Sequence, residues 1–133
     1  MHTVLRSVLS AVGVGKRVLM EAVGIVLNIG TDHVAEFESG FRRYELPIWE
    51  DFVERGIMLH ASLTKMDIST QPVEGAVQYL ISVAFADEEG HHLHDSDPRF
   101  QAWNEMADAF QVAPPIVTGG AVITSAGEAQ TTG

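Results

Sequence analysis

The sequence contains no cysteine and few basic residues, and each shortage excludes a class of function. Without cysteine the chain can form no disulfide, no thiolate-ligated zinc site and no thiol nucleophile. Eight Lys and Arg residues stand against 18 Asp and Glu residues, which gives a formal net charge of −10. A chain of this charge repels phosphate groups, so neither nucleic acid nor a membrane is expected as a partner.

Long apolar runs are also missing. Hydrophobic residues make up 46% of the 133 positions, yet no stretch approaches the roughly 18 apolar residues that a membrane-spanning helix needs. The length suits one domain around a single core. We expect a soluble protein, with the cytoplasm as the default compartment.

Charge divides the chain unevenly. Residues 1–19 contain Arg6, Lys16 and Arg17 but no acidic residue. We therefore predict an N-terminal extension over residues 1–19, a domain over residues 20–124 and a flexible tail over residues 125–133. The tail prediction depends on its small, polar composition.

The first part of the domain predicts a strand and a long helix. Apolar and β-branched residues indicate a strand over residues 20–30, and Thr31 or Asp32 is expected to cap the helix that follows. Gly56 ends the helix, and Pro47 should kink it or separate two helices. Apolar residues recur on one helix face at steps of three and four: Val34, Phe37, Phe41, Tyr44, Ile48 and Phe52.

Two alternating strands follow and should pair as an antiparallel hairpin. Over residues 57–64, alternation places Leu59 and Leu63 on one face and Met58, His60, Ser62 and Thr64 on the other. The second strand covers residues 76–87. A helix over residues 98–110 and, after two prolines, a strand over residues 116–124 complete the order β-α-β-β-α-β.

This order predicts the ferredoxin-like α+β fold, a four-stranded antiparallel sheet with helices on one face. In a single chain the other sheet face has no cover, although it carries apolar as well as polar side chains. We therefore expect a homodimer in which two sheets pack face to face and form a barrel.

Several stretches resemble the dimeric α/β barrel superfamily, which includes antibiotic-biosynthesis monooxygenase-like, stress-responsive and muconolactone-isomerase-like proteins. They are VGIVLNIG with DHVAEFESGF, the helix broken near LPIWEDF, IMLHASLTKM, and YLISVAFADEEGHHLHDSDPRFQAWNEMADAF. The resemblance covers residues 20–124 and implies a pocket between sheet and helices in each protomer. The haem-degrading branch uses an asparagine on the first strand, but Asn28 lies near the strand's end and no histidine matches.

His60 is the leading candidate for chemistry. It should point into the barrel or pocket near Ser62 and Asn28, where an imidazole can act as a general base and these neighbours can stabilise an oxyanion. The chain would then be a small cofactor-independent enzyme, monooxygenase-like or isomerase/cyclase-like, acting on a hydrophobic molecule of aromatic or polyketide type. The alternative is a non-catalytic ligand-binding or stress-associated homodimer, in which these polar side chains only bond one another.

Aromatic side chains and Met58 supply further candidates for contact with that molecule. Trp49 lies off the apolar stripe and suits a pocket mouth, while Tyr44 and Trp103 could line a site for a flat ligand. The structural alternative is that aromatic residues at helical spacing form the core.

The stretch GHHLHDSDPRF, residues 90–100, holds three of the six histidines and is interpreted as a loop leading into a helix. His92 and His94 could bind a metal with His91 and Asp95, or form a pH-sensitive cover over the pocket. A helix start at Asp97 and Pro98 accounts for more of the stretch. We therefore predict no metal site and no cofactor, with His92 and His94 as ligand contacts.

Overall fold

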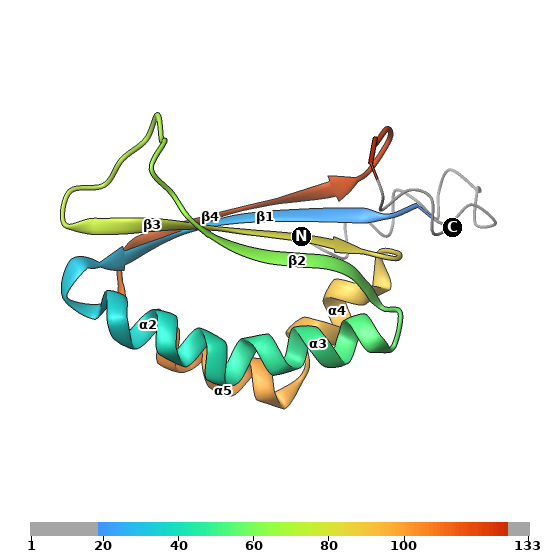
Figure 1. The fold of residues 1–133 in the computed structure, drawn as a ribbon, viewed down its shortest axis with the longest axis horizontal. Coiled ribbons are helices and arrows are strands. Elements are labelled where there is room, and N and C mark those ends of the chain that lie inside the picture. The colour runs from blue at the N-terminus through green and yellow to red at the C-terminus, as the bar shows by residue number, and fades with distance from the viewer. Residues whose placement is uncertain (1–18, 128–133) are drawn as a thin grey trace.

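The chain folds into an antiparallel sheet that helices cover on one face (Figure 1). The computed structural model describes residues 19–127, so nearly all of the predicted N-terminal extension and the end of the predicted tail lie outside the described residues. The elements are β1 (Glu21–Gly30), a 3-10 turn η1 (Thr31–His33), α2 (Val34–Gly40), a π-helix η2 (Phe41–Glu45), α3 (Leu46–Glu54), β2 (Met58–Lys65), β3 (Ala76–Phe85), α4 (Glu89–Asp95), α5 (Pro98–Asp108) and β4 (Gln111–Ala121).

The strands lie in the order β2-β3-β1-β4, and β1 pairs antiparallel with both β3 and β4. This is the ferredoxin-like α+β fold, which the element order predicted. The predicted hairpin of β2 and β3 is also confirmed. None of the described helices is both long and apolar enough to cross a bilayer.

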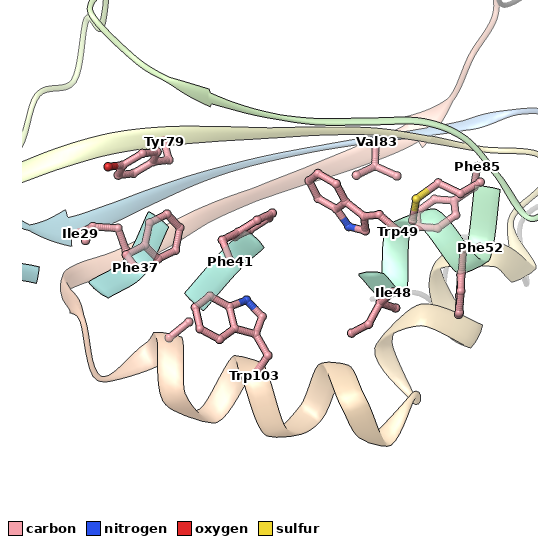
Figure 2. Packing of buried hydrophobic residues seen from close by; sticks show 12 residues of the cluster. Ile29, Phe37, Phe41, Ile48, Trp49, Phe52, Tyr79, Val83, Phe85 and Trp103 are labelled. Carbon is pink, nitrogen blue, oxygen red and sulfur yellow. The ribbon is translucent and has the colours of Figure 1, made fainter. Parts of the chain in front are cut away.

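The core lies between the sheet and the helices. Ile29 and Tyr79 point from the sheet toward Phe37, whose ring centroid is 4.7 Å from that of Tyr79. Figure 2 shows Trp103 reaching from α5 toward Phe41. A Cβ at Gly40 would lie 2.6 Å from Trp103 Cζ3, so only glycine lets α2 and α5 approach this closely.

The first long helix differs from its prediction in two ways. Neither Thr31 nor Asp32 caps it, because the chain enters through the 3-10 turn η1. In addition, the wider π-helical turn of η2 contains an extra residue and shifts the later positions around the helix. Glu45 therefore faces the core at 4% exposure, while Tyr44, predicted on the apolar stripe, is 39% exposed.

The histidine-rich stretch is helical where the sequence predicted a loop. Residues 89–95 form α4, whose buried side carries His91 and His94. The prediction failed because this seven-residue helix buries histidines with acidic partners and has no apolar stripe. The predicted start of the next helix is confirmed, since the Asp97 side chain accepts a hydrogen bond from the Arg99 N–H at 2.8 Å.

Strand irregularities account for two further corrections. The register of β2 against β3 shifts between Met58 and His60, so Met58 faces the helices, opposite to the predicted alternation. Pro114 and Pro115 lie inside β4 and do not precede it. An edge strand tolerates proline because one side of its backbone has no partner strand.

Candidate functional site

A pocket of about 210 Å³ lies between the sheet and the helices, and we call it the inner pocket. Its apolar walls come from β1, β2, β3, β4, α3 and α5, and include Val23, Ile25, Trp49, Met58, Ile81, Val83, Phe85 and Phe100. Figure 2 shows Trp49 between Phe41 and Phe85, below Val83. The pocket is smaller than the roughly 300–1,000 Å³ typical of drug-sized ligands, so it suits a small molecule.

Polar side chains enter this apolar space from one end. Glu45 Oε2 lies 2.6 Å from His94 Nε2, and His94 Nδ1 lies 3.0 Å from Asp95 Oδ1. The Glu45 and His94 side chains are only 5% and 10% exposed. Both ring nitrogens of His94 therefore have a carboxylate partner.

These partners decide the charge of His94. Burial lowers the pKa of His94, but the hydrogen bonds that its ring donates to Asp95 and Glu45 outweigh burial and raise the pKa to about 9. At neutral pH His94 is thus an imidazolium that donates one N–H to each carboxylate. It has no further N–H to offer a ligand.

The two carboxylate oxygens of Glu45 differ in their surroundings, because Oε2 is bonded to His94. Within residues 19–127, Oε1 of Glu45 is buried and has no hydrogen-bond partner. A buried carboxylate oxygen without a donor is unfavourable by about 1–3 kcal/mol or more. Because Glu45 lines the inner pocket, this oxygen can accept a hydrogen bond from an O–H or N–H group of a bound molecule.

A second histidine–carboxylate pair lies at the same end of the inner pocket. His91 Nδ1 and Glu21 Oε1 share a hydrogen bond, and both side chains are buried. The pair joins α4 to the first residue of β1. The His92 ring stacks on His91 with centroids 5.7 Å apart and does not line the inner pocket.

His60, Ser62 and Asn28 lie on the sheet face that the helices leave open. His60 is exposed, whereas Asn28 is buried. The Asn28 amide donates a hydrogen bond to the Pro114 carbonyl, and its side-chain oxygen accepts one from Gln78. Their partners on β3, Ala84 and Gln78, are six residues apart. At about 3.3 Å per residue His60 and Asn28 are roughly 20 Å apart, so one protomer does not bring them together.

The remaining predicted contacts divide into two groups. Trp49, Met58 and His94 line the inner pocket, while Tyr44, His92 and Trp103 do not. Trp103 belongs to the core, and its ring stacks near Tyr44 with centroids 5.9 Å apart. Sequence reasoning missed Glu21 and Glu45. A signal existed for Glu45, which is four residues after Phe41 and three before Ile48 and so falls on a helical apolar face.

The arrangement fits proton transfer better than metal binding. Within the described part of the chain, no group of three or more Asp, Glu or His side chains is arranged to hold a metal ion. The facing atoms of Glu45 and His94 are engaged with each other. What the inner pocket offers is a buried carboxylate oxygen beside apolar walls.

Comparison with known proteins gives the fold. No family model and no curated protein matches the chain. A dimeric ferredoxin-like protein from an uncultured marine organism matches with a TM-score of 0.66, 9% identity and coverage of 83% of this chain and 93% of that one. A protein of Nitrosomonas europaea, provisionally named an antibiotic biosynthesis monooxygenase, matches with a TM-score of 0.65, 11% identity and coverage of 84% and 97%.

A similarly named protein of Caulobacter crescentus matches with a TM-score of 0.63, 18% identity and coverage of 80% and 92%. The chain has the same ferredoxin-like fold as these three proteins. The resemblance seen in the sequence is thereby confirmed for the fold. Identities this low carry no residue roles from these proteins to this chain.

Proposed function

We propose that the chain is a small enzyme that removes a proton from a small, largely apolar molecule in the inner pocket, with Glu45 as the base. The observation that carries this proposal is the buried carboxylate of Glu45, a residue that lines the inner pocket and whose Oε1 has no hydrogen-bond partner among the described residues. A substrate O–H can donate to that oxygen, and an adjacent acidic C–H comes within its reach.

His94 acts as a positioning residue in this proposal. Its imidazolium holds Glu45 through Oε2, which fixes the direction of Oε1. Its positive charge also stabilises the anion that forms on the substrate, and this effect is strong in a site with little water. Trp49 and Phe100 supply flat apolar walls that hold a ring.

The deprotonated substrate has two outcomes. In the first, the proton returns to a different atom, which gives an isomerase, or the carbanion adds to a carbonyl carbon of the same molecule and the new alkoxide takes the proton from Glu45, which gives a cyclase. In the second, the carbanion of a CH₂ group adds dioxygen and takes a proton to form a hydroperoxide, which loses water and leaves a ketone; one oxygen atom stays on the product and the other leaves as water, as in a monooxygenase. The names of the Nitrosomonas and Caulobacter proteins favour the second outcome. This retains the function class expected from the sequence, an enzyme that works with side chains alone, but gives the role of base to Glu45. His60, Ser62 and Asn28 do not line the inner pocket and have no part in this reaction.

The test is hydrogen–deuterium exchange at the acidic C–H of small cyclic ketones such as 2-indanone, followed by NMR in D₂O. The wild-type protein should bind the probe and accelerate exchange. The substitution Glu45→Gln should slow exchange by about 10²-fold or more. The control Glu50→Gln changes an exposed carboxylate on α3 and should have no effect. Binding without exchange supports the non-catalytic alternative, and exchange at the wild-type rate in Glu45→Gln contradicts the role of Glu45.

We also propose a homodimer formed through the open sheet face, where Val26, Leu80 and Ile116 lie. The dimeric marine protein of the same fold supports this arrangement. Ile116→Glu should produce a monomer in sedimentation equilibrium. Leu93→Glu is a matched control, because Leu93 is 47% exposed, close to the 43% of Ile116, but lies on α4 in the helical layer. A wild-type monomer would contradict the dimer.

A further inference from the structure

A second hollow, of about 350 Å³, lies between the continuous helical run α2-η2-α3 and the edge strand β2. We call it the outer groove. Its charged side chains are Glu38, Arg42 and Lys65, and its apolar walls include Phe41, Trp49 and Leu63. Trp49 borders both the outer groove and the inner pocket, whereas Glu45 and His94 border only the inner pocket. The outer groove is therefore a separate site.

Glu38, the acidic side chain of the outer groove, already has two partners. Glu38 Oε2 accepts a hydrogen bond from the Tyr79 hydroxyl at 2.6 Å and lies 3.3 Å from Lys65 Nζ. The Tyr79 hydrogen bond, together with Lys65 and Arg42, lowers the pKa of Glu38 despite some burial, so the carboxylate is ionised at neutral pH. Glu38 thus balances Lys65.

Arg42 leaves the outer groove with an excess positive charge. Across residues 19–127, its guanidinium has no hydrogen bond and no ion pair of its own, although it borders the outer groove. A positive excess is unusual on a chain whose net charge is −10. Guanidinium binds a carboxylate through two parallel N–H donors, and such charge-assisted hydrogen bonds are about twice as strong as neutral ones.

The walls indicate what the rest of the ligand is like. Phe41 and Trp49 are 4% and 5% exposed, and their rings meet edge to face with centroids 5.0 Å apart. They form a rigid aromatic wall, and Leu46 and Leu63 add aliphatic surface. A volume of about 350 Å³ is within the range of small-molecule sites.

We infer that the outer groove binds a small aromatic carboxylate. Its carboxylate pairs with Arg42 and approaches Lys65, and its ring lies against Phe41 and Trp49. This site is additional to the proton-transfer site: it shares Trp49 with the inner pocket but includes neither Glu45 nor His94. A molecule bound here contacts Trp49, which also lines the inner pocket.

Calorimetric titration of the full chain with sodium benzoate tests the inference. We expect saturable binding, weakened by added salt because the contact is ionic. Benzyl alcohol, which has the same ring but no charge, should bind at least tenfold more weakly. Arg42→Gln should lower benzoate affinity about tenfold, the loss of one charge-assisted contact. Arg42 is exposed, so this change leaves the core intact.

Arg43→Gln is the matched control. Arg43 is the neighbouring arginine, but its guanidinium lies 5.3 Å over the Tyr44 ring and does not border the outer groove. Benzoate affinity should be unchanged in this variant and also in Glu45→Gln, which separates this site from the proton-transfer proposal. The inference is overturned if benzoate does not bind, if benzyl alcohol binds as tightly, or if Arg42→Gln binds benzoate like the wild type.

Discussion

His94 on α4 and Glu45 in η2 are joined by a hydrogen bond of 2.6 Å between buried side chains that are 49 residues apart in the chain. The bond attaches the short helix α4 to the π-helical turn and fixes both at one end of the inner pocket. A buried ion pair often contributes little net stability compared with apolar packing, because both charges lose their hydration. Any stability that this pair supplies therefore depends on His94 keeping its proton.

The first prediction concerns the charge of His94. Glu45→Gln removes one of the two carboxylates that hold its proton, so the pKa of His94 should fall from about 9 by roughly one unit or more. NMR titration of the His94 ring measures this directly. Glu50→Gln, which changes an exposed acid on the next helix, should leave the value unchanged. An unaltered pKa in Glu45→Gln would mean that Asp95 alone keeps His94 protonated.

The second prediction is the pH dependence of stability. The pKa of His94 is raised on folding from 6.5 to about 9, so its stabilising effect is complete below pH 6.5 and is lost as the pH rises through 9. This shift corresponds to about 3 kcal/mol of unfolding free energy. Urea unfolding at pH 6 and pH 9.5 measures the loss. In His94→Gln the fall in unfolding free energy between pH 6 and pH 9.5 should be smaller by about 3 kcal/mol. A fall equal to that of the wild type would contradict the raised pKa of His94.

The sequence predicted the element order and hence the fold, because alternation and helical periodicity are strong in β2, β3 and the first long helix. It also placed Trp49, Met58 and His94 among the ligand contacts, and all three line the inner pocket. Met58 arrives there through a strand bulge, however. Such a bulge is a local backbone irregularity that residue alternation does not reveal.

Glu45 and Glu21 were missed for a different reason. Both lie on the side of their element that faces the core. Acidic residues are rarely buried unless they are paired, so from sequence alone they are assigned to the solvent-exposed surface. Their burial depends on His94 and His91, which are distant in sequence and which the same reasoning placed in a loop. The extra residue of the π-helical turn then exchanges Tyr44 for Glu45 on the buried face. Helical periodicity alone does not choose between them, because both Tyr44 and Glu45 lie three or four residues from Phe41 and from Ile48.

The third prediction tests the buried hydroxyl of Tyr79. Burial and the hydrogen bond to Glu38 raise the pKa of Tyr79, so the hydroxyl is a donor at every pH at which the fold is studied. Tyr79→Phe should lower the free energy of unfolding by about 1–3 kcal/mol, as for a hydrogen bond to a charged group. Tyr44→Phe is the control, since Tyr44 is 39% exposed, and should change stability by less than about 0.5 kcal/mol.

Coupling between Tyr79 and Glu38 separates the hydrogen bond from packing. In a double-mutant cycle with Glu38→Gln, the interaction free energy should be about 1 kcal/mol or more. If the changes in unfolding free energy of the two variants were strictly additive, the stability lost in Tyr79→Phe would come from repacking and not from the hydrogen bond to Glu38.

The fourth prediction concerns how α4 is held against the sheet. Gly90 packs on Phe85, and a Cβ at this position would lie 2.6 Å from Phe85 Cδ1 and 3.0 Å from Phe85 Cβ. Because Phe85 is 3% exposed and cannot move away, Gly90→Ala should push α4 outward at a cost of about 1–3 kcal/mol.

That displacement should also affect the site, because α4 carries His91 and His94 to their carboxylate partners. We therefore expect the pKa of His94 to fall in Gly90→Ala together with the stability, measured by the same NMR titration. Gly120→Ala is the control, since nothing lies within 4 Å of a Cβ built there. If Gly90→Ala lost stability but kept the His94 pKa near 9, the pair of His94 and Glu45 would not depend on the close packing of Gly90 against Phe85.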